Sequence, residues 1–471
     1  MARSLAPATT LVGVGAALLC LTALAIWWPG VVEYDSVEQY KQVLSGAYDD
    51  WHPPAMARLW AALHPLGPGA VPMFIWQVAL YWLGLGLIAA ALARMGKLRA
   101  GAVVLAIGAF PVFAGWQGAV LKDTQMLGAT LAAAGLVAWW RLAGKRVPTA
   151  AIAAALLLLV YATLARANAV FATMPLVVTL WPGPARPWRR GGAFVLGILA
   201  LLVVMPLINH RLLGADETTV TRTVPTYDLA GIAHFTGADD VLLPRERALI
   251  TARHCYQPFF WDPLGDTAHC DAVFIRLNNL PRAELNRLWL AAVARHPLAY
   301  AEHRLNHLNA TDRLIVPRGW EGAVPPWQSE PNALGLASPG ATARWVSIAA
   351  GWLAETPLGW PAVWIVIAVL GMWVAARRPP APLRDLALAL GMSALSLEAS
   401  FAIVSIASDL RYHLWPMLAT ALMAVLLVAE GSLPRRALAM GGAALALVIG
   451  IGATARIALP HAPRGYEAML G

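Results

Sequence analysis

The chain has 471 residues, of which 59% are hydrophobic and only 13% are charged. Soluble domains are about one-quarter charged, so this composition excludes an ordinary soluble protein and indicates an integral membrane protein. The net charge of +9 does not require a nucleic-acid partner, because many of the basic residues lie in short loops between apolar segments.

Apolar segments recur along the whole chain, each close to the roughly 20 residues that a helix needs to cross the hydrocarbon core. We predict an all-α membrane protein with about eleven spans of this kind, at residues 9–28, 71–93, 101–118, 124–140, 149–165, 168–181, 191–210, 359–376, 385–406, 412–430 and 437–459. The chain then divides into an N-terminal membrane part (1–210), a polar segment (211–340) and C-terminal membrane helices (341–471).

Short basic loops follow every second span, at residues 94–99, 141–146, 186–190, 377–384 and 435–436. Because successive spans cross the membrane in opposite directions, all of these loops are expected on one side. Cytoplasmic loops are enriched in Lys and Arg, so we predict a cytoplasmic N-terminus and a non-cytoplasmic C-terminus. The loop 29–70 and the segment 211–340 are then expected outside the cytoplasm.

Two apolar segments have more than one interpretation. Residues 341–355 could form a further span, but that would move the basic loop 377–384 to the outside, so we expect an interfacial or re-entrant helix. The first apolar run could be a signal peptide that is cleaved near residue 25. It continues through Trp27 and Trp28, where interfacial aromatic residues are expected, which favours a retained anchor.

The loop 29–70 contains two short helical patterns. Asp35 and the residues that follow it predict a helix start, and Gly46 predicts the end of that helix. A second helix is predicted to start at Pro53-Pro54 and to end before Gly67. Helices of this length with one apolar face are expected to lie along the bilayer surface.

The segment 211–340 is polar and contains Cys255 and Cys270. In an oxidising compartment their spacing favours a disulfide that closes a loop. Free thiols remain an alternative, as does a metal site that would include the preceding residues His254 and His269.

Unusual polar residues fall where this topology places the non-cytoplasmic side. They come from the first loop, from the turns after the third and fifth spans, and from the junction of the ninth and tenth spans: Glu33, Asp35, Asp50, His52, Lys122, Arg166, Asp409, Arg411, Tyr412 and His413. Glu398 lies inside the ninth span, where an ionisable group is costly and usually functional. We expect these acids and cations to converge around one cavity.

Two short motifs resemble those of the polyprenol-phosphate-dependent GT-C glycosyltransferases, which are multi-pass membrane enzymes. Glu33-Tyr34-Asp35 is similar to the acidic pair in the first outer loop of that superfamily, and Arg411-Tyr412 to a late Arg-Tyr of bacterial members. The segment 211–340 lies where many bacterial members carry an insertion, whereas the large C-terminal soluble domain of some members is missing. The resemblance implies a GT-C-like enzyme of the bacterial inner membrane. It would transfer a sugar from a polyprenyl-phosphate donor to an envelope glycan, lipid or protein.

That reaction needs a base and an anion-binding site. A carboxylate can deprotonate the acceptor hydroxyl, and Asp35 is the first choice, with Glu33 in support. Cations must hold the leaving lipid phosphate. The candidates for binding the donor are Lys122, Arg166 and Arg411, with Asp409, Tyr412 and Glu398. The candidates for binding the acceptor, or a divalent Mg²⁺ or Mn²⁺ ion, are Asp50, His52 and His413. A single displacement of this kind would invert the anomeric centre.

Simpler interpretations and other functions remain open. Asp35 could serve only as a helix N-cap, and His413 could be an ordinary residue of the membrane interface. A polymerase or ligase of lipid-linked polysaccharide is a second enzyme hypothesis, with His303, Arg304 and His307 as its candidate residues. A lipid-sugar flippase or transporter is a third hypothesis, although the sequence shows no inverted repeat.

Overall fold

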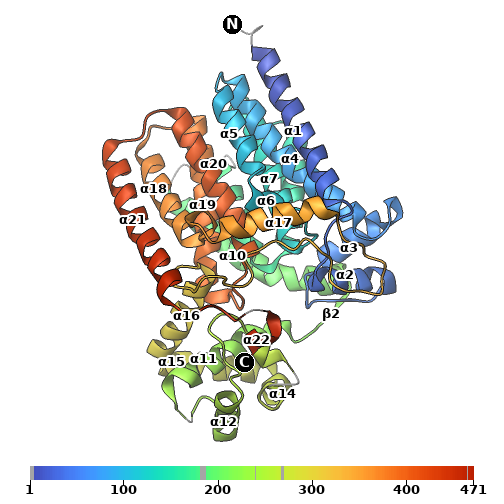
Figure 1. Ribbon diagram of the computed structural model, residues 1–471, viewed down its shortest axis with the longest axis vertical. Coiled ribbons are helices and arrows are strands. Elements are labelled where there is room, and N and C mark those ends of the chain that lie inside the picture. The colour runs from blue at the N-terminus through green and yellow to red at the C-terminus, as the bar shows by residue number, and fades with distance from the viewer. Residues whose placement is uncertain (1–4, 181–186, 239, 267–269, 464, 471) are drawn as a thin grey trace.

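The computed structural model describes residues 5–180, 187–238, 240–266, 270–463 and 465–470, and it is built almost wholly from helices (Figure 1). The last residue of the predicted span 168–181, the first residue of the basic loop 186–190, and His269 lie outside the described residues. The bundle is formed by helices α1 (Leu5–Trp27), α4 (Val71–Arg94), α5 (Leu98–Gly108), α6 (Pro111–Trp116), α7 (Lys122–Arg141), α8 (Thr149–Ala165), α9 (Val170–Leu180), α10 (Pro187–Leu207), α18 (Pro361–Arg377), α19 (Pro382–Val404), α20 (Leu414–Glu430) and α21 (Arg435–Ala458).

A helix occurs at each predicted span, but one span is interrupted. The predicted span 101–118 consists of two short helices, α5 and α6, because Pro111 begins α6 and Phe110 before it is extended. A residue that precedes proline is disfavoured in the helical conformation. Six helices of the described chain are long and apolar enough to cross a membrane. The chain is therefore an all-α protein with the helices of a membrane protein, and the number of eleven spans stays a prediction.

The centre of the bundle depends on close contact between α4 and α7. A Cβ atom on Gly84 would lie 2.5 Å from the carbonyl oxygen of Leu131, and one on Gly135 would lie 2.7 Å from the carbonyl oxygen of Gly84. Small residues at such positions let two helix backbones approach each other, as is common between membrane helices. This contact fixes the position of the N-terminal end of α7, where Lys122 lies.

The predicted basic loops lie together at one end of the bundle. Arg94 donates to the carbonyl of Trp139, and Lys97 donates to the carbonyl of Ala429. Arg378 pairs with Glu430 at 3.0 Å in the same region. The helices of the segment 211–340 lie at the opposite end of the bundle (Figure 1). The two ends therefore differ as the charge pattern predicts, and the membrane side that each end faces stays a prediction.

Helix α17 (Ala341–Ala354) crosses the bundle instead of joining it (Figure 1). Its 14 residues would extend about 21 Å, which is less than the hydrocarbon thickness of about 30 Å. The hydroxyl of Ser347 on this helix donates to the carbonyl of Pro325. The prediction that residues 341–355 do not form an ordinary span is consistent with this crossing geometry.

The first loop forms α2 (Tyr34–Ser45) and α3 (Pro54–Leu63), followed by the 3₁₀ helix η2 (His64–Leu66). Gly46 ends α2 with a φ of 71°, the left-handed conformation typical of a helix C-terminus. The two predicted helices are therefore confirmed, together with their ends. A parallel sheet of two short strands, β1 (Tyr48–Asp49) and β2 (Ala215–Asp216), joins this loop to the segment 211–340.

The segment 211–340 contains helices α11 (Thr223–Thr236), α12 (Pro244–Ala252), α13 (Asp262–Gly265), α14 (Asp271–Asn279), α15 (Arg282–Arg295) and α16 (Pro297–Thr311). These helices bury a hydrophobic cluster of their own, which includes Tyr227 and Ile232. Cys255 and Cys270 form a disulfide in this cluster, so the disulfide prediction is confirmed and the free-thiol and metal alternatives for this pair are wrong. The remaining short elements are η3 (Ala167–Ala169), η4 (Ile208–Leu212), η5 (Val220–Arg222), η6 (Pro357–Gly359), η7 (Leu410–His413) and α22 (Tyr466–Leu470).

Candidate functional site

The acidic pair lies where the loop after α1 runs beside the start of α7. An isolated parallel bridge joins Val31 to Ala119, which places the first turn of α2 next to Lys122. Glu33 occupies the N-cap position of α2, and its side chain makes no capping hydrogen bond. Asp35 is in the first helical turn and its carboxylate faces cations, so the interpretation of Asp35 as only an N-cap is wrong.

Five charged side chains form what we call the carboxylate–cation cluster: Glu33, Asp35, Lys122, Asp409 and Arg411. An Asp35 carboxylate oxygen lies 3.2 Å from Nζ of Lys122 and 3.6 Å from Nη2 of Arg411. The same guanidinium contacts Glu33 at 3.2 Å and Asp409 at 3.1 Å. Lys122 and Arg411 are 18% and 12% exposed, so both cations are largely buried while a path to solvent remains. Residues 35, 122 and 411 therefore share one end of the bundle, as the topology predicts.

His52 completes one side of the cluster. Nδ1 of His52 lies 3.0 Å from Nζ of Lys122, and Nε2 lies 3.8 Å from the Asp35 carboxylate. Lysine has no acceptor, so Nδ1 accepts this hydrogen bond and the ring proton is on Nε2. Burial, together with the charge of Lys122, lowers the pKa of His52 to about 3. His52 is therefore neutral, and its Nδ1 lone pair is already used by Lys122.

The two carboxylates of the acidic pair differ in charge state. Burial opposes ionisation of Asp35, but Lys122, Arg411 and His52 outweigh it and hold the pKa of Asp35 well below its usual range. Burial raises the pKa of Glu33 to about 7, against the opposing effect of Arg411. At neutral pH, Asp35 is a permanent negative charge and Glu33 is close to half ionised. Carboxylates with environments this different can take different roles at one site.

Arg166 lies beside the cluster but already has a partner. Its guanidinium forms an ion pair with Asp123, a carboxylate that is 1% exposed, and its Nε donates to Asn168 at 2.7 Å. The guanidinium carbon also lies 4.3 Å from the centroid of the Tyr412 ring, and that of Arg411 lies 5.5 Å from the same ring. Tyr412 is thus in contact with both arginines, and Arg166 is held in place by Asp123 and Asn168.

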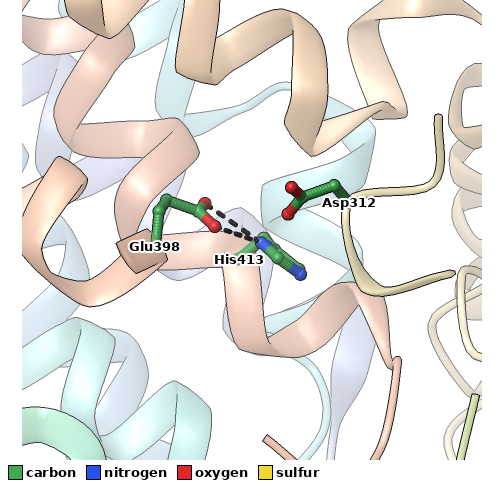
Figure 2. Close-up of side chains that lie close together, drawn as sticks. All are labelled: Asp312, Glu398 and His413. Atoms are coloured by element: carbon green, nitrogen blue, oxygen red, sulfur yellow. Dashed lines mark hydrogen bonds and ion pairs between the residues drawn. The ribbon is translucent and has the colours of Figure 1, made fainter. Parts of the chain in front are cut away.

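Three of the predicted site residues lie elsewhere. Asp50 accepts hydrogen bonds of 2.6 Å from the backbone and hydroxyl of Thr218, so it connects the first loop to the segment 211–340. Glu398 and His413 contact each other, away from the acidic pair, and Asp312 lies beside them (Figure 2). His413 is fully buried, which excludes the interpretation as an interfacial residue.

Sequence reasoning missed Asp312 and Gly322. Asp312 follows the end of α16, and nothing local distinguishes it from other acids of the segment 211–340. Gly322 has a φ of 76°, and a side chain there would collide with Asp409. Its carbonyl accepts a hydrogen bond of 2.8 Å from the nitrogen of Leu410, so this glycine holds the segment that carries Asp409 and Arg411. A positive φ is the usual requirement for glycine, but the sequence alone does not reveal the contact.

The residues of the polymerase or ligase hypothesis lie in the interior of the segment 211–340. His303 and His307 are fully buried and Arg304 is 5% exposed. His303 and Arg304 contact one carboxylate oxygen of Asp228 at 3.1 and 2.6 Å, and Tyr256 bonds to the other nitrogen of His303 at 2.8 Å. These groups are buried and interact with one another, so they provide no observation in favour of that hypothesis.

No protein family and no curated protein matched the chain. Among solved structures, the chain is similar to the archaeal oligosaccharyltransferase AglB from Archaeoglobus fulgidus, in complex with an inhibitory peptide and a dolichol-phosphate. The sequence identity is 14% and the TM-score is 0.38, with 95% of this chain and 56% of that chain covered. The chain thus spans little more than half the length of that protein. A likeness this weak identifies no family, and function is inferred below from the site itself.

Proposed function

We propose that the protein is an inverting glycosyltransferase of the bacterial inner membrane. It moves a sugar from a polyprenyl-phosphate donor to an envelope glycan, lipid or protein outside the cytoplasm. The observation that carries this proposal is the contact of Asp35 with both Lys122 and Arg411 at one end of an apolar helix bundle. A carboxylate that can take a proton lies there beside two cations that can hold a phosphate.

Lys122 and Arg411 bind the phosphate of the donor. Arginine can contact two phosphate oxygens through its planar guanidinium, and lysine supplies a point charge. Glu33 and Asp409 fix the orientation of the Arg411 guanidinium through two of its nitrogens. The polyprenyl chain then extends along the apolar surface of the bundle, which keeps the sugar at the level of the cluster.

Asp35 accepts the proton of the acceptor hydroxyl. The acceptor oxygen forms a new bond to C1 of the sugar, the bond from C1 to the phosphate oxygen breaks, and polyprenyl phosphate leaves as an anion. Attack from the side opposite the phosphate inverts the anomeric centre. The leaving group needs no proton, so its developing charge is stabilised by Lys122 and Arg411 alone.

Donor binding activates this base. A carboxylate with a strongly lowered pKa is a weak base, and Asp35 is in that state while Lys122 and Arg411 face it. A phosphate that draws both cations toward itself, and that repels the carboxylate, raises the pKa of Asp35 toward the operating pH. The acceptor is therefore deprotonated efficiently only when the donor is in place.

A divalent ion at Asp35 and His52 is not part of this proposal. Such an ion would have to displace Lys122 from both residues, because Nζ of Lys122 lies 3.2 Å from Asp35 and 3.0 Å from His52. Lys122 provides positive charge at the place where a bridging Mg²⁺ or Mn²⁺ would sit. We therefore propose that transfer proceeds without a metal at the carboxylate–cation cluster.

The test is transfer by purified protein in detergent, offered a panel of radiolabelled polyprenyl-phosphate sugars and a membrane extract as the source of acceptor. The wild-type protein is expected to move label to a product from at least one donor. The variant Asp35→Asn is expected to lose this activity, whereas Glu38→Gln, on the same helix but paired with Lys41 at the surface, keeps it. Equal transfer by both variants would refute the proposed site.

A further inference from the structure

Asp312, Glu398 and His413 form a second polar group, separate from the carboxylate–cation cluster. They come from three elements: the end of α16, the C-terminal half of α19 and the end of η7. One potential ligand atom from each residue lies within 4.8 Å of the others. Figure 2 shows the carboxylates of Asp312 and Glu398 on two sides of the His413 ring. Both oxygens of Glu398 lie near Nδ1 of His413, at 2.9 and 3.0 Å.

This group is buried and short of positive charge. His413 is fully buried and Glu398 is 6% exposed. Oδ1 of Asp312 is buried without a hydrogen-bond partner. Among the described residues no Lys or Arg forms an ion pair with either carboxylate. The neighbouring Arg313 donates to the carbonyls of Glu321 and Trp320 instead. Buried charges are normally paired or bound to a metal.

We propose that Asp312, Glu398 and His413 bind a divalent transition-metal ion, with Nδ1 of His413 and one oxygen of each carboxylate as ligands. Tetrahedral ligands that lie about 2.0–2.1 Å from an ion are about 3.3 Å apart. The observed separation of 2.9 Å between Nδ1 and Glu398 needs to widen by only a few tenths of an ångström when the ion replaces the shared proton.

The ligand set indicates which ions fit. Carboxylate oxygens alone suit Mg²⁺ and Ca²⁺, whereas imidazole suits Zn²⁺ and other transition metals. Two carboxylates with one imidazole therefore favour Zn²⁺ or Mn²⁺. With Nδ1 bound to the ion, the ring proton lies on Nε2, which is buried without a hydrogen-bond partner.

The ion would connect the segment 211–340 to the bundle near the candidate active site. His413 is two residues from Arg411, in the same short helix η7. The residues just before η7 already contact the segment 211–340, because Arg304 donates a hydrogen bond of 2.7 Å to the carbonyl of Ser405. A metal at Asp312, Glu398 and His413 would fix η7 from its other end and thereby restrict the position of Arg411.

The test measures metal content and stability, and it does not depend on sugar transfer. Full-length protein in detergent, freed of any histidine tag, is stripped with a chelator and titrated with Zn²⁺ and Mn²⁺. Bound metal is measured by mass spectrometry and the thermal midpoint by tryptophan fluorescence. The variants are Asp312→Asn and Glu398→Gln, and the control is Asp385→Asn, an exposed carboxylate on the same helix as Glu398.

The wild-type protein and the control are expected to bind one equivalent of Zn²⁺ or Mn²⁺ and to gain thermal stability. Each variant is expected to bind at least about 100-fold more weakly, because a ligand is lost, whereas even outer partners of a ligand contribute about 10–100-fold. If a variant does not fold, the wild-type protein decides: its thermal midpoint must fall on chelation and recover with Zn²⁺ or Mn²⁺. Metal binding by the variants equal to that of the control would overturn the proposal. So would a wild-type protein that neither ion binds or stabilises.

Discussion

Replacing Asp35 with Asn is expected to slow catalysis and to strengthen donor binding at the same time. The substitution keeps the size of the side chain and removes one negative charge from the carboxylate–cation cluster. A positioned general base contributes about 10²–10⁴-fold to a rate, so we expect kcat to fall by that factor. Binding responds in the other direction, because the Asp35 carboxylate competes with the donor phosphate for Lys122 and Arg411.

The gain in binding can be worked out from the structure. A phosphate on the far side of Lys122 would lie about 6 Å from Asp35, since the carboxylate is 3.2 Å from Nζ and a charge-assisted hydrogen bond adds about 2.8 Å. At an effective dielectric constant of about 20, two unit charges at that distance repel by about 3 kcal/mol. Asp35 is 17% exposed, and screening that halves the repulsion leaves about 1.4 kcal/mol, or about tenfold in Kd.

The assay is steady-state transfer for kcat, combined with equilibrium binding of the donor to detergent-purified protein. Glu38→Gln is the control for a charge change on the same helix, and it should alter neither quantity by more than about threefold. A tenfold weaker donor affinity in Asp35→Asn would contradict the competition between the carboxylate and the phosphate. A kcat that stays within threefold of the wild-type value would contradict the role of Asp35 as the base.

Three further predictions address charge state, stability and topology. The raised pKa of Glu33 means that its contribution to stability is present at low pH and is lost as the pH rises through 7. The thermal midpoint of the wild-type protein should therefore fall between pH 6 and 8, by the equivalent of about 1 kcal/mol in the free energy of unfolding. This fall should be smaller in Glu33→Gln. Removing the disulfide of Cys255 and Cys270, which are 15 residues apart, should destabilise the segment 211–340 by about 3 kcal/mol, measured by limited proteolysis. In intact cells, a membrane-impermeant maleimide should label Glu38→Cys and should not label Arg99→Cys. The reverse labelling would show that the predicted topology is inverted.

Local patterns predicted much of the fold. Gly46 and the two prolines at positions 53 and 54 define helix ends through backbone geometry that the residue type alone determines. The convergence of Asp35 with Lys122 and Arg411 followed from topology, because residues at the same end of neighbouring spans must share one face of a bundle. No side-chain contact had to be known for that prediction.

Other features depend on packing between distant parts of the chain, and the sequence could not provide them. Asp312 and Glu398 are brought together only when α16 contacts α19, and neither helix carries a signal for the other. His303 is buried because its side chain packs inside the segment 211–340, where Asp228 is its partner. The low pKa of Asp35 and the raised pKa of Glu33 also depend on three-dimensional distances, although the two residues are only two positions apart.

Binding of a polyprenyl phosphate that carries no sugar tests the central claim most directly, because it does not require the sugar or the acceptor to be known. Purified protein in lipid nanodiscs would be titrated with this lipid for wild type, Lys122→Gln, Arg411→Gln and the exposed control Lys41→Gln. Loss of a charged contact to phosphate is expected to weaken binding about tenfold or more in the first two variants, with the control unchanged. Equal affinity in all four proteins would show that these cations do not hold the donor phosphate.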